Sequence, residues 1–157
     1  MADQIQVSLY VDADACPVKD EILKVSYRHN LPVFIVSNQW LRLEVGPLVQ
    51  KIVVPDGPDV ADDWIADHIT ENDIAITADI LLAKRCLDKE AQVIGPTGKA
   101  FSPENIGMAV AMRDLKAHLR ETGESKGYNP SFSKEDKSRF LQALEKSIQT
   151  LKKRLSQ

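Results

Sequence analysis

Short apolar runs alternate with amphipathic segments along the first hundred residues of the chain. Five runs, at 5–11, 32–37, 49–54, 73–77 and 91–95, have the composition of strands that are buried on both faces. Helices are expected after the first, third and fourth runs, at about 17–29, 60–69 and 79–90, and the second of them has apolar residues at helical spacing. Strands joined by helices in short units predict a parallel sheet with helices on both faces. We therefore expect an α/β fold, a three-layer α/β/α sandwich with a mostly parallel sheet of about five strands.

The rest of the chain is predicted to be helical. Ser102-Pro103 is typical of a helix start, and this helix is expected to reach about residue 121. A loop rich in Gly, Ser and Pro follows at 122–133, and Ser133 with Asp136 resembles a capping box for a last helix. The apolar stripe of that helix is Phe140, Leu144, Ile148 and Leu151. We expect the stripe to pack on the α/β part or on a second subunit.

Length and composition are those of one globular domain. The chain has 157 residues, of which 43% are hydrophobic and 27% are charged. We expect a single domain over 1–157, with an α/β core at 1–100 and a helical extension at 101–157.

No apolar run approaches the roughly 18 residues of a membrane span, and the first residues do not resemble a signal peptide, so we expect a cytoplasmic protein without membrane contact. Cys16 and Cys86 are expected to be buried, reduced thiols.

Charge is distributed unevenly along the chain. Residues 1–100 hold 16 acidic and 9 basic residues, whereas residues 101–157 hold 7 acidic and 11 basic residues. The first part is therefore suited to cations, and the second is suited to a polyanion. A solvated, charged C-terminal helix explains the basic excess equally well.

Acidic residues cluster after the predicted strands. In a parallel sheet the carboxyl ends of the strands lie along one edge, where ligands bind. Two aspartates follow the first strand, three lie in the first turns of the helix after the third strand, and a Thr-Ala-Asp follows the fourth. We expect these segments to converge at one site, whose acidic members are Asp12, Asp14, Asp59, Asp62, Asp63 and Asp79.

A divalent cation would relieve the repulsion in such a cluster. Carboxylates a few ångströms apart repel one another, and Asp59 and Asp63 are also an unfavourable i, i+4 pair on a helix. Ligand sets made only of oxygen favour Mg²⁺ or Mn²⁺ over zinc. One or two such ions can activate water for phosphodiester hydrolysis. We take all six aspartates as candidate metal ligands and assign candidate catalytic roles to Asp12, Asp14, Asp63 and Asp79.

Helix capping explains any single aspartate of this cluster equally well. Asp14 stands just before the helix that begins near Pro17, so capping is its strongest alternative role. Thr77 is expected to cap the helix at 79–90 and to leave Asp79 free to bind a ligand.

Other polar residues receive weaker assignments. Lys19, Asn38 and Thr77 are candidates for contacting a phosphate at the same edge. Three further aspartates, Asp67, Asp73 and Asp88, are interpreted as surface residues. No catalytic role is assigned to the three histidines, His29, His68 and His118.

Four stretches of the chain resemble the YaiI/YqxD family of bacterial proteins. They are VDADACPVK (11–19), PDVADDWIADHI (58–69), DIAITADILLAKRCL (73–87) and FSKEDKSRFLQALE (132–145). The resemblance spans nearly the whole chain and departs at 122–131, where relatives often have Gly-Gly-Pro-Pro. The family is grouped with PIN-like domains, which are metal-dependent nucleases built on an α/β/α sandwich.

The resemblance implies a metal-dependent nuclease that acts on nucleic acid, with RNA favoured. PIN-like domains carry an acidic residue after the first strand, which corresponds to Asp12. A second lies in a mid-chain helix and corresponds to one of Asp59, Asp62 or Asp63. A T-x-D after the fourth strand falls on Thr77 and Asp79, and Asp14 belongs to the motif of the family itself. The oligomeric state is left open, a homodimer included.

Other functions fit parts of the same pattern. A phosphatase of the haloacid dehalogenase type has D-x-D after its first strand, with Asp12 as the nucleophile, but its later acidic pair normally follows a strand. A receiver domain would use Asp56 after the third strand, and its other residues do not align. GPTGK (95–99) is too short for a phosphate-binding loop. An inactive PIN-like scaffold that binds RNA or a protein through its basic C-terminal part remains the main alternative.

Overall fold

The computed structural model of the chain describes residues 6–13, 16–42, 46–121 and 132–156. The strands are β1 (Leu9–Asp12), β2 (Val33–Ser37), β3 (Val49–Val53), β4 (Ile74–Ile76), β5 (Gln92–Ile94) and β6 (Ala100–Phe101). The helices are α1 (Lys19–His29), α2 (Val60–His68), α3 (Ile80–Asp88), α4 (Ile106–Glu121) and α5 (Lys134–Leu155). The predicted order of elements is confirmed, although α1 begins at Lys19, two residues after Pro17.

The sheet has the strand order β3-β2-β1-β4-β5-β6. The first five strands are parallel, and β6 runs antiparallel to β5. This arrangement confirms a mostly parallel sheet, with six strands where about five were expected. The additional strand, β6, has only two residues, so no apolar alternation could reveal it in the sequence.

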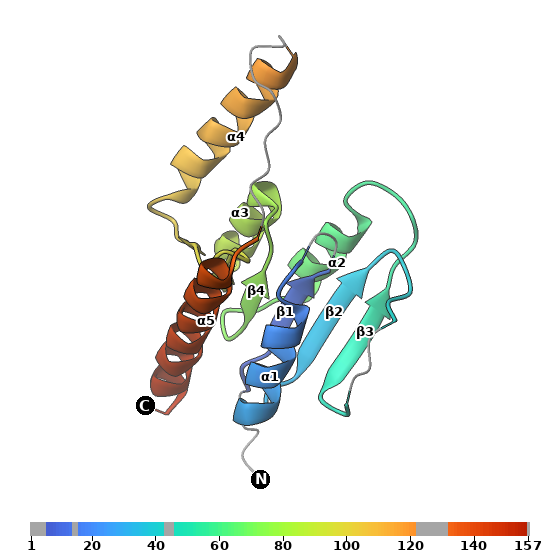
Figure 1. The fold of residues 1–157 in the computed structure, drawn as a ribbon, viewed down its shortest axis with the longest axis vertical. Helices are drawn as coiled ribbons and strands as arrows, with labels where there is room; N and C mark the ends of the chain where they lie inside the picture. Colours follow the sequence, from blue (N-terminus) through green and yellow to red (C-terminus); the bar gives the residue numbers. More distant parts are fainter. Residues whose placement is uncertain (1–5, 14–15, 43–45, 122–131, 157) are drawn as a thin grey trace.

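Helices cover both faces of the sheet, as expected for a three-layer sandwich (Figure 1). Along β1, Leu9 and Val11 point into a core shared with α1 and α5, whereas Tyr10 points into a core shared with α2 and α3. The same alternation continues in β2 and β4, because successive side chains of a strand point to opposite faces. Burial on both faces explains why the strands read as continuous apolar runs.

Helix α5 packs on the core of the same chain. Its predicted capping box is confirmed, with Ser133 Oγ accepting from the Asp136 N–H and the Asp136 carboxylate accepting from the Ser133 N–H. Glu145 on α5 pairs with Arg28 and His29 at the end of α1. The predicted apolar stripe is fully buried and consists of Phe140, Leu144, Ile148 and Leu151. The stripe was expected to pack on the α/β part or on a second subunit, and in the structure it packs on the α/β part.

Helix α4 is much less embedded than the other helices. Only Ile106 and Ala109, near its start, are buried among its 16 residues. The remainder extends away from the sheet (Figure 1). None of the helices in the described part of the chain combines the length and apolarity that a membrane crossing requires.

Asp73 is buried, so its assignment to the surface was wrong. Its carboxylate accepts hydrogen bonds from the Ser8 N–H, the Thr70 N–H and the Thr70 hydroxyl. Asp73 thereby joins the start of β1 to the turn before β4, a long-range role that local sequence does not reveal. Asp67 and Asp88 are exposed, as expected. Both cysteines are buried and free, also as expected.

Replacing Asp73 with alanine should lower the free energy of unfolding by roughly 1–3 kcal/mol, because it leaves buried donors without an acceptor. Urea unfolding followed by circular dichroism measures this loss. Asp67→Ala, on the exposed side of α2, is the matched control and should change stability by less than about 0.5 kcal/mol. Equal stability of the two variants would contradict the structural role of Asp73.

Candidate functional site

The candidate site lies where the chain reverses its direction of winding across the sheet. From β1 the sheet grows through β2 to β3 on one side and through β4 to β5 on the other. Ligands of open α/β sheets bind at such a switch point, outside the carboxyl ends of the strands. Asp12 ends β1, and Thr77 directly follows β4, so both lie at this point.

A buried hydroxyl joins the two strand ends. Thr77 Oγ1 donates a hydrogen bond to Asp12 Oδ2 over 2.9 Å and accepts one from the Asp79 N–H over 2.9 Å. Thr77 is itself buried, with 2% of its surface exposed. Its hydroxyl therefore fixes Asp12 and the backbone of Asp79 relative to each other.

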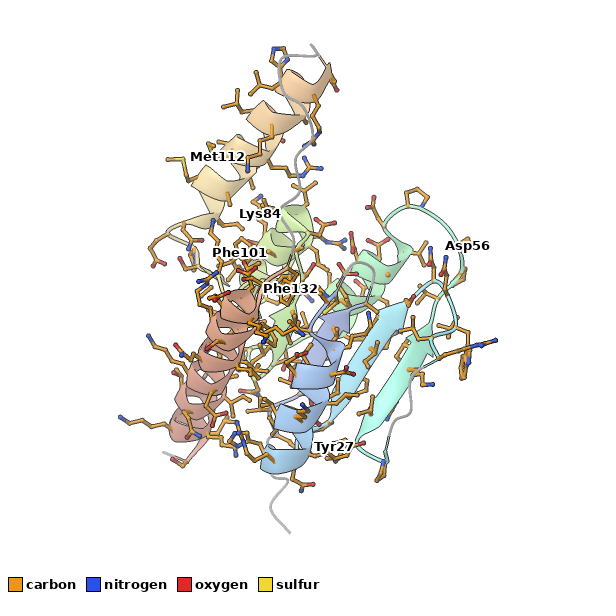
Figure 2. All side chains as sticks on the ribbon, viewed as in Figure 1. Tyr27, Asp56, Lys84, Phe101, Met112 and Phe132 are labelled. Carbon is orange, nitrogen blue, oxygen red and sulfur yellow. The ribbon has the colours of Figure 1, made fainter. Side chains whose placement is uncertain are left out.

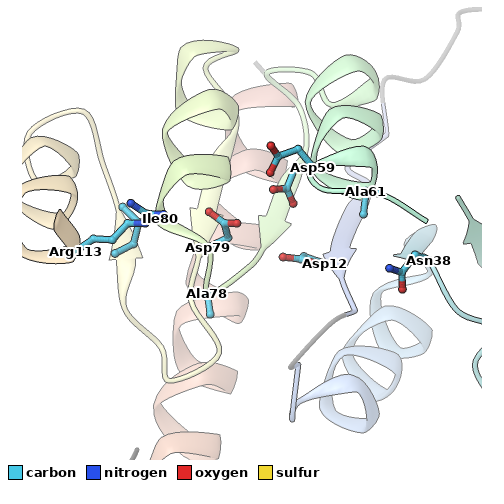
Figure 3. Close-up of a pocket in the computed structure, with 10 residues that line it drawn as sticks. Asp12, Asn38, Asp59, Ala61, Ala78, Asp79, Ile80 and Arg113 are labelled. Atoms are coloured by element: carbon cyan, nitrogen blue, oxygen red, sulfur yellow. The ribbon is translucent and has the colours of Figure 1, made fainter. Parts of the chain in front are cut away.

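Carboxylates from three segments line one cavity of about 520 Å³ (Figure 3). They come from the end of β1, the start of α2 and the start of α3. Asn38 and Arg113 lie on opposite sides of these carboxylates (Figure 3). The charged and amide residues that line the cavity are Asp12, Asn38, Asp59, Asp62, Asp79 and Arg113.

Asp79, and not Thr77, caps α3, so the expected division of roles was wrong. Asp79 Oδ1 accepts hydrogen bonds from the N–H groups of Leu81 and Leu82. A carboxylate at a helix N-terminus is also favoured by the helix dipole. Capping holds Asp79 in place at the cavity, so capping and lining the cavity are compatible here.

Asp59 lies at the start of α2 without capping it. Its backbone is in the left-handed region, with φ of 65°, and its side chain makes no capping hydrogen bond. Aspartate tolerates this conformation better than most residues. The capping alternative considered for Asp59 is therefore excluded, and its side chain lines the cavity instead.

Asp62 experiences the crowding of the carboxylates most strongly. Burial, followed by the negative charges of Asp79 and Asp12, raises the pKa of Asp62 to about 7. A hydrogen bond with Asp79 also favours the protonated form. The free protein therefore holds a proton between these carboxyl groups at a pH where aspartates are ordinarily ionised.

Asp63 does not line the cavity. It is exposed and forms an ion pair with Arg85 of α3 over 2.7 Å. Asp62 instead shares a face of α2 with the buried residues Ile65 and Ala66, three and four positions further on. This spacing was the signal in the sequence that could have separated Asp62 from Asp63.

The remaining candidates have different positions. Asp14 lies outside the described residues. Lys19 does not line the cavity, and its ammonium group donates to the carbonyl oxygens of Ala13 and Cys16. Asn38, which follows β2, does line the cavity.

Arg113 is the charged residue of the cavity that the sequence analysis missed. It comes from α4, far along the chain from the last strand-end motif, and its Nη1 also donates to Asp114. The basic excess of residues 101–157 was the only hint in the sequence. Arg113 supplies a cation beside the carboxylates, in a position where it can contact an anionic group of a ligand.

The donor set of the cavity is compatible with Mg²⁺ or Mn²⁺. Within the described part of the chain, no group of three or more His, Cys, Asp or Glu side chains is arranged to hold a metal ion. Mg²⁺ does not need such a cage, since it keeps several waters and binds through one or two carboxylates and a substrate phosphate. The carboxylates that line the cavity, with the proton shared around Asp62, offer this kind of site.

The pKa of Asp62 predicts how stability depends on pH. Between 3.8 and about 7 the folded state keeps a proton on Asp62 that the unfolded chain releases, so this group lowers stability as pH rises through that window. Asp62→Asn should therefore raise the free energy of unfolding at about pH 8, by roughly 1–2 kcal/mol after allowance for solvent screening. The gain should disappear toward about pH 4. Urea unfolding of the metal-free protein at several pH values measures it.

Asp63→Asn is the matched control for this experiment. It removes the same charge one residue away, where the carboxylate is exposed and paired with Arg85. We expect no stabilisation at any pH from this variant. Equal effects of the two substitutions would mean that Asp62 has no special electrostatic environment.

Comparisons with known proteins identify relatives across nearly the whole chain. The sequence profile described as "Uncharacterized BCR, YaiI/YqxD family" matches residues 10–150. A UPF0178 protein of Agrobacterium fabrum is 60% identical over 145 residues, which cover 92% of this chain and 95% of the relative. A UPF0178 protein of Parvibaculum lavamentivorans is 58% identical over 146 residues, with coverage of 93% and 96%. No solved structure matches the chain.

Proposed function

This chain belongs to the YaiI/YqxD family, and we propose that it is a metal-dependent nuclease that hydrolyses phosphodiester bonds. The proposal starts from the family and from the carboxylate cavity. RNA is favoured over DNA as the substrate. The observation that carries the proposal is the convergence of Asp12, Asp62 and Asp79 on one cavity at the switch point of the sheet. These residues come from three separate segments of the chain. The mutual repulsion of the three carboxylates lowers the stability of the folded protein, and a purely structural role would not require that cost.

The proposed cofactor is Mg²⁺ or Mn²⁺, which one or two of the carboxylates of Asp12, Asp62 and Asp79 would hold together with waters and a substrate phosphate. When bound, such an ion supplies activation of a water molecule and stabilisation of the leaving oxygen. The oxygen-only donor set and the raised pKa of Asp62 support this choice.

Residues of the chain would position the substrate and the carboxylates. Thr77 holds Asp12 by its hydroxyl, and the α3 N-terminus holds Asp79, so neither carboxylate needs to reorganise. Arg113 and Asn38 flank the cavity and can donate hydrogen bonds to non-bridging oxygens of a phosphodiester. Asp63, proposed from the sequence as catalytic, is given no role here because of its pairing with Arg85 outside the cavity.

Metal binding tests the site without knowledge of the substrate. We expect the wild-type protein to bind Mn²⁺ saturably in isothermal calorimetry and Asp79→Asn to lose this binding. Asparagine is chosen because it can accept the hydrogen bonds from Leu81 and Leu82, so the cap of α3 is kept. Asp79→Ala would remove the cap as well, at a cost of about 1 kcal/mol, and would confuse the two effects.

Cleavage of a fluorescent single-stranded RNA then tests the activity. The rate with Mn²⁺ should fall by more than about a hundredfold in Asp79→Asn, since even groups that only orient a metal ligand are worth 10- to 100-fold. Asp63→Asn is the control and should cleave at the wild-type rate. RNA cleavage by Asp79→Asn at the wild-type rate would refute the assignment of the site, whereas inactivity of the wild-type protein would favour the scaffold alternative.

A further inference from the structure

A second cavity lies along α4, next to the carboxylate cavity. It has a volume of about 300 Å³ and is formed by α4 together with the start of α3 and Lys99 before β6. We call it the α4 groove. Its lining includes Ile80, Lys99, Met108, Met112, Lys116 and Arg120, with Arg113 at the end near the carboxylates.

Every charged side chain that lines the α4 groove is a cation. Lys99, Arg113, Lys116 and Arg120 all line it, and the acidic residues of α4 do not. Lys116 and Arg120 are separated by one helical turn and are both exposed. Such a row of cations favours an extended anionic occupant over a single small anion.

The groove also carries exposed apolar surface. Met108 is 70% exposed and Met112 is 44% exposed, and both line the groove beside Ile80. Met112 extends outward from α4 (Figure 2). The described residues thus leave Met108 largely and Met112 partly uncovered, although a helix on a globular domain normally buries its apolar face.

The two cavities adjoin. Ile80 and Arg113 line both of them, so an occupant of the α4 groove lies next to the carboxylate cavity. In Figure 3 these two residues lie together at the α4 side of the carboxylate cavity.

We propose that the α4 groove binds a single strand of nucleic acid and guides it to the carboxylate cavity. This inference rests on the proposed nuclease function and adds the form of the substrate and the surface that holds it. Lys99, Lys116 and Arg120 contact phosphates, while Met108 and Met112 lie against the faces of bases.

The combination of cations and methionines in the groove favours a single strand over a duplex. A duplex presents phosphates on its outside and hides the faces of its bases in stacked pairs, so it could use the cations of the groove but not the methionines. A single strand exposes both phosphates and base faces, and proteins bind it with a basic groove that also offers surfaces for the bases. Methionine is flexible and polarisable, so it adapts to bases of different shape.

Binding of a fluorescein-labelled oligouridylate, measured by anisotropy in EDTA, tests this proposal apart from cleavage. The double variant Lys116→Ala/Arg120→Ala should bind about tenfold or more weakly than the wild-type protein at low salt. The slope of log K against log salt should become shallower by about 0.7 for each phosphate that the variant no longer neutralises. A DNA oligonucleotide of matching sequence and a pre-annealed RNA duplex are measured in parallel, and the duplex should bind more weakly than the single strand.

Lys146→Ala/Lys153→Ala, on the exposed side of α5, is the matched control, because it also removes two positive charges from exposed positions of one helix. It should bind like the wild-type protein. Equal loss in both double variants, or no loss in either, would overturn the proposal, as would tighter binding of the duplex.

Met108→Ser/Met112→Ser should also weaken binding of the single strand. If it instead lowers the molecular mass in light scattering and leaves RNA binding unchanged, the groove is a contact between two copies of the chain.

Failure of the nuclease proposal has a different signature. Loss of RNA binding in Lys116→Ala/Arg120→Ala together with no cleavage by the wild-type protein would leave the groove as an RNA-binding surface without activity. Metal-dependent cleavage with unchanged RNA binding in that variant would refute the groove and keep the nuclease.

Discussion

The hydrogen bond from Thr77 to Asp12 is the contact on which the candidate site depends. It connects β1 and β4, the two strands between which the sheet changes its direction of winding. The same hydroxyl accepts from the Asp79 N–H, so one buried side chain fixes the end of one strand and the start of α3. Because the Thr77 side chain is buried, leaving its hydroxyl unpaired would be costly. The geometry of the carboxylates is thus built into the core of the sheet.

Packing of α2 on the sheet holds Asp62 in an electrostatically unfavourable position. Burial and neighbouring charges make ionisation of Asp62 unfavourable, and aromatic contacts between α2 and the sheet keep the helix in place. Trp64 of α2 stacks on His68 and lies against Tyr10 and Phe34 of the sheet. Aromatic packing of this kind keeps Asp62 close to the carboxylates that repel it. A carboxyl group whose pKa is raised by burial and neighbouring charges is typical of functional sites.

Local patterns predicted much of the fold and part of the site. The apolar runs gave the strands, and the Ser133–Asp136 box gave the start of α5. The convergence of carboxylates followed from the geometry of parallel strands alone. Other features depend on distant contacts. The burial of Asp73 requires Ser8, 65 residues away, and the position of Arg113 requires α4 to lie beside α3. No local pattern encodes such pairs.

The sequence by itself determined that this chain forms an α/β sandwich with acidic residues gathered at one edge, because periodicity and strand connectivity are local properties. Tertiary structure decided which acidic residues face the cavity. Because α2 packs through Ile65 and Ala66, Asp62 faces the cavity, whereas Asp63 is exposed and forms an ion pair with Arg85. Capping of α3 by Asp79 is a local contact, with N–H groups two and three residues further on. Tertiary structure decided that Thr77 reaches across to Asp12, since a hydroxyl bonds to whichever partner the assembled sheet brings within reach.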